Sequence, residues 1–291
     1  MKTHFLLSFL FLSTFFVSCS KEDSGNEPGK ETVAKTMLNV SYGADPVQNM
    51  DIYLPEGRTT ATTKVIIMIH GGSWAGGDKA ELTPFVDTLK RRLPDYALFN
   101  INYRLSATPN NVFPTQENDV KAAIKSIYGK KSEYLISDKF VLMGASAGGH
   151  LALLQGYKYT SPVKPKAIVS FAGPTDLNDM FTNPAGGNQL ISLLLASAIG
   201  KTPAQDPALY TNSSPVNFVG ATSPPTLLLY GDVDPLVRPA QAILLKDKLQ
   251  AASVPNEYFL FANTAHVDTW TNLVFYQSFE KVQAFITANV Q

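Results

Sequence analysis

A glycine-flanked serine at residues 144–148 constrains the fold of this chain more than any other segment. The five residues read Gly-Ala-Ser-Ala-Gly, follow the apolar run 140–143 and precede a helix-like stretch at 151–157. Backbone segments approach closely on both sides of such a turn, so only glycine or alanine fits beside the serine. The pentapeptide therefore predicts a buried strand that feeds directly into a helix, with the side chain of Ser146 held out at the sheet edge.

Short apolar runs alternate with amphipathic stretches along most of the chain. This alternation indicates an α/β fold whose sheet is mostly parallel and doubly wound, with the first two strands forming an antiparallel edge. The 291 residues, of which 45% are apolar, suffice for one large core, so we expect a single domain at 36–291. The predicted strands are 37–42, 49–54, 64–69, 97–103, 140–143, 167–171, 226–230 and 258–261, and the predicted helices are 117–128, 151–157, 239–251 and 271–289.

Ser146 is a candidate nucleophile, although small residues around a serine also occur in ordinary turns. A serine hydroxyl needs a histidine base, an orienting carboxylate and donors for an oxyanion. Of the four histidines, His4 lies in the N-terminal segment, His70 in a glycine-rich turn and His150 on the helix after the serine. His266 follows the last predicted strand, where a base is expected, and we favour it over the alternative of a plain surface histidine.

Two aspartates compete for the role of the orienting acid. The apolar run 226–230 predicts a buried parallel strand, and Asp232 and Asp234 come directly after it. A carboxylate just past the end of a strand can reach a histidine delivered from the next loop. We favour Asp234 as the acid and expect Asp232 to form the turn by accepting hydrogen bonds from nearby amides. A plain loop carboxylate is the alternative for either residue.

Candidate oxyanion donors lie in a second glycine-rich turn. The predicted strand 64–69 runs directly into the sequence His-Gly-Gly-Ser-Trp at 70–74. Oxyanion donors are backbone N–H groups that no side chain blocks, which consecutive glycines permit. We expect the first donor to be the amide of Ala147, immediately after the nucleophile, and the others to be those of Gly72 and Ser73.

Other classes of function find little support in the sequence. A phosphate loop at 71–79 fails the required spacing, because Asp78 separates Gly77 from Lys79 and Ala80 stands where serine or threonine should be. The formal net charge is zero, and no basic patch favours a nucleic-acid partner. No cluster of histidine, cysteine and carboxylate has metal-ligand spacing. We therefore expect neither a metal nor an organic cofactor.

Several motifs together resemble those of the α/β-hydrolase esterases, in the hormone-sensitive-lipase-type and feruloyl/acetyl-esterase-like branch. The resemblance covers residues 37–290 and implies an α/β-hydrolase fold. It also implies that Asp234 is the acid and that the oxyanion donors lie on the His-Gly-Gly turn, although Ser73 stands where the family usually has a third glycine. The motifs are His-Gly-Gly-Ser-Trp at 70–74 with Gly-Gly-Asp-Lys at 76–79, Asn-Tyr-Arg-Leu-Ser at 102–106, Phe113-Pro114 with Asp119, the serine turn through 152, and Gly231-x-x-Asp234-x-x-Val237.

The resemblance also implies a location for substrate selection. Residues 176–223 interrupt the alternation of strands and helices and contain an apolar run at 190–196. In this family an insert at that place forms a small helical cap over the nucleophile, and apolar cap residues suit an acyl chain or an aromatic acid. The alternative is that the helix at 190–196 simply packs on the core.

The expected function is hydrolysis of carboxylic esters by a serine esterase through an acyl-enzyme, with a small ester or an acylated polysaccharide as substrate. Acetyl or feruloyl groups on polysaccharides are the specific hypothesis. A peptidase or amidase would use the same residues, since the three side chains do not encode the leaving group. A non-catalytic glycan-binding lipoprotein on a hydrolase fold is the alternative outside enzymes.

The first residues predict export and lipidation. Residues 1–18 combine Lys2 with an apolar run that is too short to span a membrane, which is typical of a signal peptide. Residues 16–19, Phe-Val-Ser-Cys, resemble a lipobox, and Cys19 is the single cysteine of the chain. We therefore expect Cys19 to be lipidated and to anchor the protein to the bacterial envelope, and simple secretion is the alternative.

A polar segment separates this predicted anchor from the domain. Residues 19–35 are rich in Ser, Lys, Glu, Asp, Gly and Asn, which is typical of a flexible tether. Residues 20–23, Ser-Lys-Glu-Asp, resemble a surface-export signal of Gram-negative lipoproteins, which would place the protein at the outer membrane or cell surface. A plain polar linker explains these residues equally well.

Overall fold

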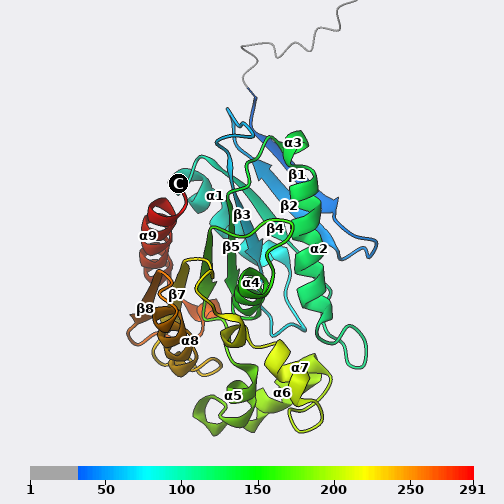
Figure 1. Ribbon diagram of the computed structural model, residues 1–291, viewed down its shortest axis with the longest axis vertical. Helices are drawn as coiled ribbons and strands as arrows, with labels where there is room; N and C mark the ends of the chain where they lie inside the picture. The colour runs from blue at the N-terminus through cyan, green and yellow to red at the C-terminus, as the bar shows by residue number, and fades with distance from the viewer. Residues whose placement is uncertain (1–31) are drawn as a thin grey trace, which may run out of the picture. The chain divides into compact units, whose positions relative to one another are not determined.

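An eight-stranded sheet organises residues 32–291, the part of the chain that the computed structural model describes (Figure 1). Residues 32–291 form one compact unit. The predicted signal peptide at 1–18, the predicted lipidation site Cys19 and the tether up to residue 31 lie outside the described residues. The ordered strand nearest the N-terminus begins at Lys35, one residue before the predicted domain boundary.

The sheet confirms the predicted fold class. Its strand order is β1-β2-β4-β3-β5-β6-β7-β8. The pairs β1–β2 and β2–β4 are antiparallel, whereas every pair from β4–β3 to β7–β8 is parallel. The strands are β1 (Lys35–Ser41), β2 (Asn49–Leu54), β3 (Lys64–Ile69), β4 (Tyr96–Ile101), β5 (Phe140–Ala145), β6 (Ala167–Phe171), β7 (Thr226–Gly231) and β8 (Asn256–Phe261).

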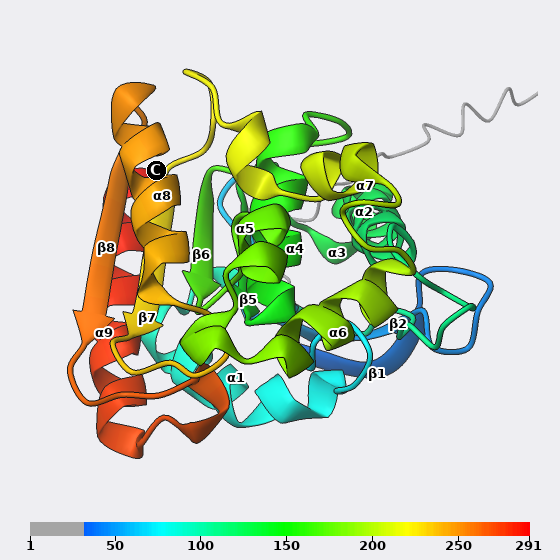
Figure 2. The ribbon, with the colours of Figure 1, turned by 90° about the horizontal axis from the view of Figure 1, so that it is seen from below.

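Helices cover both faces of this sheet. Figure 2 shows α1 and α9 on one face and α2, α4 and α8 on the other. The central strands are therefore buried on both sides, which explains why β3 and β7 are continuous apolar runs instead of alternating ones. These helices are α1 (Thr83–Arg92), α2 (Thr115–Gly129), α4 (Ala147–Lys158), α8 (Pro239–Ala251) and α9 (Asn272–Asn289), with the short α3 (Lys131–Tyr134) after α2.

Two features of the helices differ from the sequence prediction. The helix after the serine begins at Ala147, four residues earlier than predicted, because the serine turn leads directly into its first turn. Helix α1 was not predicted. It follows a short 3-10 helix, η1 (Lys79–Leu82), and buries Val86 and Leu89 against the sheet.

Residues 176–223, which we call the cap segment, lie between β6 and β7. Figure 1 shows α5, α6 and α7 grouped beyond one end of the sheet. Helix α6 buries Ile191 and Leu195, while Leu193 is 66% exposed. One face of α6 therefore packs inward, as a core helix would, and the other faces solvent. The segment contains α5 (Leu177–Thr182), η2 (Ala185–Gly187), α6 (Gln189–Ile199), α7 (Pro207–Asn212) and η3 (Pro215–Phe218).

Candidate active site

The serine turn holds Ser146 in a backbone conformation that few residues adopt. Its φ is 52° and its ψ is −120°, and such outliers persist only where the surroundings impose them. A Cβ on Gly144 would lie 2.3 Å from the backbone of Gly148, and a Cβ on Gly148 would lie 2.0 Å from the carbonyl oxygen of Ile69. Both flanking glycines are thus required by close backbone contact. The turn places Ser146 between the ends of β5 and α4.

The structure brings Ser146, His266 and Asp234 into one hydrogen-bonded series. His266 Nε2 lies 2.9 Å from Ser146 Oγ, and His266 Nδ1 lies 2.7 Å from Asp234 Oδ2. The carboxylate can only accept, so Nδ1–H donates to it, and Nε2 is left to accept the hydroxyl proton of the serine. The imidazole therefore has the tautomer that a general base needs.

Asp234 is fixed by its other oxygen. Asp234 Oδ1 accepts hydrogen bonds from the amides of Leu236 and Val237 at 2.8 and 2.9 Å, and the residue is 5% exposed. Asp232 instead accepts from the amide of Thr264 at 3.1 Å. Of the two aspartates after β7, the structure thus places Asp234 at the histidine and Asp232 against the backbone of the histidine loop.

The loop that carries His266 is braced by its own neighbours. Thr269 donates to the carbonyl of His266 through both its amide, at 3.0 Å, and its hydroxyl, at 2.8 Å. The indole N–H of Trp270 donates to the carbonyl of Ala265 at 3.0 Å. Because these bonds fix the backbone on both sides of His266, the imidazole is positioned before any substrate arrives.

The second predicted turn follows β3 and has an unusual backbone. Three consecutive residues, Gly72, Ser73 and Trp74, have φ of 97°, 52° and 62°. A Cβ on Gly72 would lie 2.1 Å from the carbonyl oxygen of Gly76. Within residues 32–291, the amides of Gly72, Ser73 and Ala147 donate to no other residue. These three N–H groups therefore remain available to an oxyanion beside Ser146.

Side chains from the 102–106 segment hold this turn in place. The Tyr103 hydroxyl lies 2.9 Å from the carbonyl oxygen of Gly71 and 3.1 Å from that of His70, and its ring stacks on the His70 imidazole at 4.2 Å. The amide of Ser106 donates to the carbonyl of Trp74 at 2.9 Å. This role of Tyr103 was not predicted, because no sequence motif connects Tyr103 to a turn about 30 residues earlier in the chain.

The other two histidines in the described part of the chain are structural. His70 and His150 are fully buried, and burial lowers the pKa of both, that of His150 to about 4. His150 Nδ1 accepts from the Trp74 indole at 3.1 Å, and its Nε2–H donates to the carbonyl of Ser213 at 2.7 Å. His150 therefore ties helix α4 to the turn at 70–74 and to the cap segment.

Two cavities meet at Ser146. The larger has a volume of about 480 Å³ and also contacts Ser73 and His266. Its apolar wall comes from η1, α1 and α9 and from the ends of β3, β5 and β6, and two exposed carboxylates, Glu81 and Asp268, also line it. The apolar lining is Met68, Leu82, Phe85, Met143, Ala145, Phe171, Leu236, Val267, Phe275 and Phe279.

The smaller cavity lies under the cap segment. Its volume is about 40 Å³, and it also contacts Ser73 and Ser146 but not His266. A residue of α5 forms the first wall, residues of α6 form the second, and residues beside Asp234 complete the lining. The apolar lining is Trp74, Pro174, Met180, Ile191, Leu194, Leu195, Leu236 and Val237.

The described residues contain neither a metal-binding cluster nor a membrane-spanning helix. Among residues 32–291, no group of three or more His, Cys, Asp or Glu side chains is arranged to hold a metal ion. In the same part of the chain no helix has the length and apolar character needed to cross a bilayer.

Comparisons with known proteins identify a family and relatives that this chain resembles. The BD-FAE family profile matches residues 50–249. Esterase LipC of Mycobacterium tuberculosis is 26% identical over 226 residues, which is 74% of this chain and 55% of LipC, so the chain spans about half the length of that relative. Kynurenine formamidase of Meyerozyma guilliermondii is 28% identical over 246 residues, which is 78% of this chain and 86% of that protein.

A solved structure shares the fold. A truncated form of a carbohydrate esterase from gut microbiota superposes with a TM-score of 0.74 at 24% identity, covering 90% of this chain and 99% of that chain. With this coverage and the mostly parallel eight-stranded sheet, the fold is that of an α/β hydrolase.

Proposed function

We propose that this chain, which belongs to the BD-FAE family, hydrolyses carboxylic esters through an acyl-enzyme on Ser146. The observation that carries the proposal is the hydrogen-bonded series Ser146–His266–Asp234, with 2.9 and 2.7 Å between its members, at the meeting point of two cavities. Resemblance to Esterase LipC supports the same reaction class.

The three side chains have distinct tasks in this mechanism. As Ser146 Oγ bonds to the carbonyl carbon, His266 Nε2 takes the hydroxyl proton and then delivers it to the leaving alkoxide as the ester C–O bond breaks. Asp234 holds the imidazole in the required tautomer and stabilises its charged form. Water then attacks the acyl-enzyme by the same steps and releases the acid.

The free amides of Gly72, Ser73 and Ala147 supply the oxyanion site. They are donors that no other residue of the described chain uses, and they lie on two turns whose geometry close backbone contacts impose. Donors of this kind act without reorganisation when the negative charge develops, and each contributes about 3–4 kcal/mol of transition-state stabilisation.

Labelling with a fluorophosphonate probe tests the reaction class. We expect the wild-type protein to label and to turn over p-nitrophenyl acetate, and Ser146→Ala to do neither. Ser132→Ala is the matched control, because Ser132 lies on α3, on the surface and outside both cavities. Folded wild-type protein that neither labels nor turns over would contradict the proposal and favour a non-catalytic glycan-binding lipoprotein.

The proposed substrates are acetyl or feruloyl esters on polysaccharides. Support comes from the predicted export of the chain and from the carbohydrate esterase whose fold it shares. A panel of acetylated and feruloylated polysaccharides tests this choice, with release of acetate or ferulate as the readout. Activity confined to simple short-chain esters would contradict it.

An amidase is the second candidate. The relative named kynurenine formamidase aligns over 86% of its length, and the same three side chains can cleave an amide. Matched ester and amide substrates with the same acyl group distinguish the two classes. We expect the ester to be cleaved faster, and an equal or faster amide reaction would favour the amidase.

We further propose that Cys19 carries a lipid anchor that attaches the protein to the bacterial envelope. The lipobox-like residues 16–19 and the polar segment that follows support this proposal. Partition of the full chain between detergent and aqueous phases tests it. We expect the wild-type protein in the detergent phase and Cys19→Ala in the aqueous phase, and equal partition of both would contradict the anchor.

A further inference from the structure

We infer that the two cavities at Ser146 divide the substrate, with an acyl group of acetyl size in the small cavity and a polyhydroxylated alcohol without negative charge in the large one, which selects acetyl over feruloyl among the proposed acyl groups. This inference rests on the proposed ester hydrolysis. It names the residues that set the specificity on each side of the scissile bond.

The position of His266 assigns the cavities. The imidazole must deliver its proton to the leaving alkoxide, so the alcohol oxygen has to lie within hydrogen-bond reach of His266 Nε2. His266 lines the large cavity and does not line the small one, whereas Ser146 and Ser73 line both. The alcohol therefore extends into the large cavity. The acyl group, on the other side of the carbonyl carbon, extends into the small one.

The small cavity limits the length of the acyl group. Its volume of about 40 Å³ has room for about three or four water-sized groups at roughly 10–15 Å³ each. An acetyl group fits this space. A longer acyl chain meets the side chains of Met180, Ile191 and Leu194 from the cap segment.

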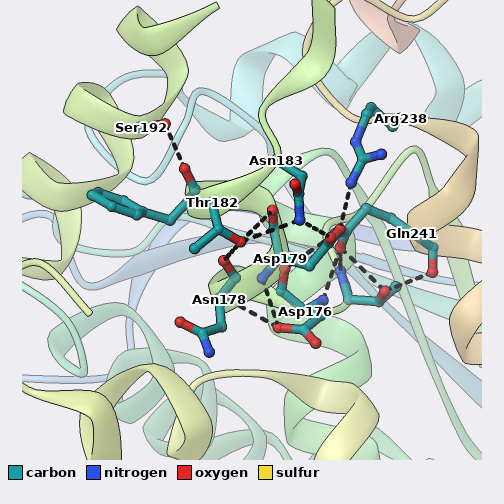
Figure 3. Close-up of polar contacts among 10 residues, drawn as sticks. Asp176, Asn178, Asp179, Thr182, Asn183, Ser192, Arg238 and Gln241 are labelled. Atoms are coloured by element: carbon teal, nitrogen blue, oxygen red, sulfur yellow. Dashed lines mark hydrogen bonds and ion pairs between the residues drawn. The ribbon is translucent and has the colours of Figure 1, made fainter. Parts of the chain in front are cut away.

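The first wall of this cavity is fixed by hydrogen bonds (Figure 3). Gln241, at the start of α8 and 1% exposed, accepts from the amides of Thr175 and Asp176 at 2.8 Å each and donates to Asp179 Oδ2 at 2.6 Å. Arg238 Nη2 donates to the same oxygen at 2.7 Å. Helix α5, which carries Met180, is therefore tied to the segment that follows Asp234.

The second wall is tied to the first. The hydroxyl of Ser192 on α6 donates to the carbonyl of Phe181 on α5 at 2.7 Å, so α6 and its cavity-lining residues are linked to the fixed helix. Retreat of either wall would break these polar contacts, which are buried at Gln241 and Ser192 and partly buried at Asp179, and buried polar groups left without partners carry a free-energy penalty. The limit on acyl length is therefore already present in the folded protein before substrate binds.

The large cavity suits a sugar ring. Phe85 and Phe275, whose ring centroids are 4.7 Å apart, offer an apolar wall for ring carbons. Glu81 and Asp268 also line it, and neither forms an ion pair with another described residue. Free carboxylates accept hydrogen bonds from hydroxyl groups and repel anions. An alcohol with several hydroxyls and no negative charge satisfies both features.

The acyl side is tested with p-nitrophenyl acetate and p-nitrophenyl hexanoate, which share one leaving group. A pocket discriminates by about 10-fold or more for each methylene that it cannot hold, so we expect kcat/KM to favour acetate by about 100-fold or more. Leu194→Ala, which shortens a wall residue that is 51% exposed, should reduce this preference about 10-fold. Leu193→Ala, on the same helix and outside both cavities, should leave it unchanged.

The alcohol side is tested with glucose pentaacetate, in which the acyl group is constant. Phe85→Ala should raise KM for this substrate about 10-fold and leave the acetate-to-hexanoate preference unchanged. Leu273→Ala, an exposed α9 residue outside the cavity, is the matched control and should behave as wild type.

Two results would overturn the assignment while leaving ester hydrolysis intact. One is wild-type protein that cleaves the hexanoate as well as the acetate in a reaction that Ser146→Ala abolishes. The other is an exchange of phenotypes, in which Phe85→Ala changes the acyl preference and Leu194→Ala does not. Loss of all Ser146-dependent turnover would instead contradict the proposed function itself.

Discussion

At the scale of single residues, Asp234 uses its two carboxylate oxygens for different purposes. Oδ1 accepts from two backbone amides of its own loop, and Oδ2 accepts from His266. The two amide bonds to Oδ1 fix the orientation of the carboxylate and therefore the direction in which Oδ2 meets His266. Since the carboxylate is buried, no water replaces it as a partner of the imidazole.

Replacing this carboxylate by an amide should stop catalysis while leaving the loop nearly intact. In Asp234→Asn the amide oxygen can still accept the loop bonds, but the imidazole loses the acceptor that holds its tautomer. We expect kcat for p-nitrophenyl acetate to fall by about 10⁴-fold. Asp232→Asn is the matched control, because the Asp232 carboxylate accepts from the amide of Thr264 and not from His266, and its kcat should change by less than about 10-fold. A larger loss in Asp232→Asn would exchange the roles of the two aspartates.

At the scale of elements, the sequence signals were strongest for the buried strands. Predicted strands 64–69 and 167–171 match β3 and β6 residue for residue, because apolar runs of this length bounded by polar turns have few other solutions. Helix α1 was missed, although Val86 and Leu89 have helical spacing and Pro84 lies at its start. Its sequence is mostly polar outside that stripe, so the apolar signal is weak.

The missed helix had a consequence for the site. The apolar wall of the large cavity combines Leu82 and Phe85 of η1 and α1 with Phe275 and Phe279 of α9, nearly 200 residues later, and with residues at the ends of the central strands. The residues that the structure places around Ser146 were identified from local motifs, one turn at a time. The cavity has no local motif, because it exists only where α1 and α9 pack side by side on the sheet, so its size and charge could not be predicted.

Helix α4 links three elements through His150, and this link should respond to pH. Burial lowers the pKa of His150 from 6.5 to about 4 in the folded protein. Between these two values the unfolded chain binds a proton that the folded protein does not, so the free energy of unfolding falls as the pH is lowered. The full loss is about 3 kcal/mol, and it is complete below pH 4.

Urea unfolding at several pH values between 7 and 4 measures this dependence. His150→Gln removes the titrating group, so the variant should be less stable than wild type at pH 7 but should lose less stability on acidification. The difference in slope between the two proteins isolates His150 from the other titrating groups. Equal slopes would contradict the assigned pKa shift.

At the scale of the whole molecule, the active-site end of the sheet depends on the N-terminal antiparallel edge. Lys79, at the start of η1, is buried and forms an ion pair with Asp51 on β2 at 2.8 Å. The same ammonium group donates to Asn39 Oδ1 on β1 at 2.8 Å. The segment between the turn at 70–74 and α1 is therefore bonded to β1 and β2, the strands at the N-terminal edge of the sheet.

Breaking this buried pair from one side should destabilise the whole domain. In Lys79→Met the Asp51 carboxylate keeps its burial and loses its counter-charge, which typically reduces the free energy of unfolding by about 3–5 kcal/mol. Urea unfolding measures the loss. Lys246→Met is the matched control, because Lys246 pairs with Asp247 at 3.2 Å where the Asp247 side chain is 61% exposed, and such surface pairs contribute about 0–1 kcal/mol.

Removing both charges separates the ion pair from simple loss of packing. The double variant Lys79→Met/Asp51→Leu leaves no buried charge without a partner, so it should recover a large part of the stability that Lys79→Met loses. If Lys79→Met is as stable as Lys246→Met, the pair contributes little and the edge strands are held by apolar contacts alone. If the double variant is no better than the single one, the loss arises from the bond to Asn39 and from packing. Recovery would instead show that the unpaired charge of Asp51 causes the loss, so the ion pair is what holds η1 to the N-terminal edge strands.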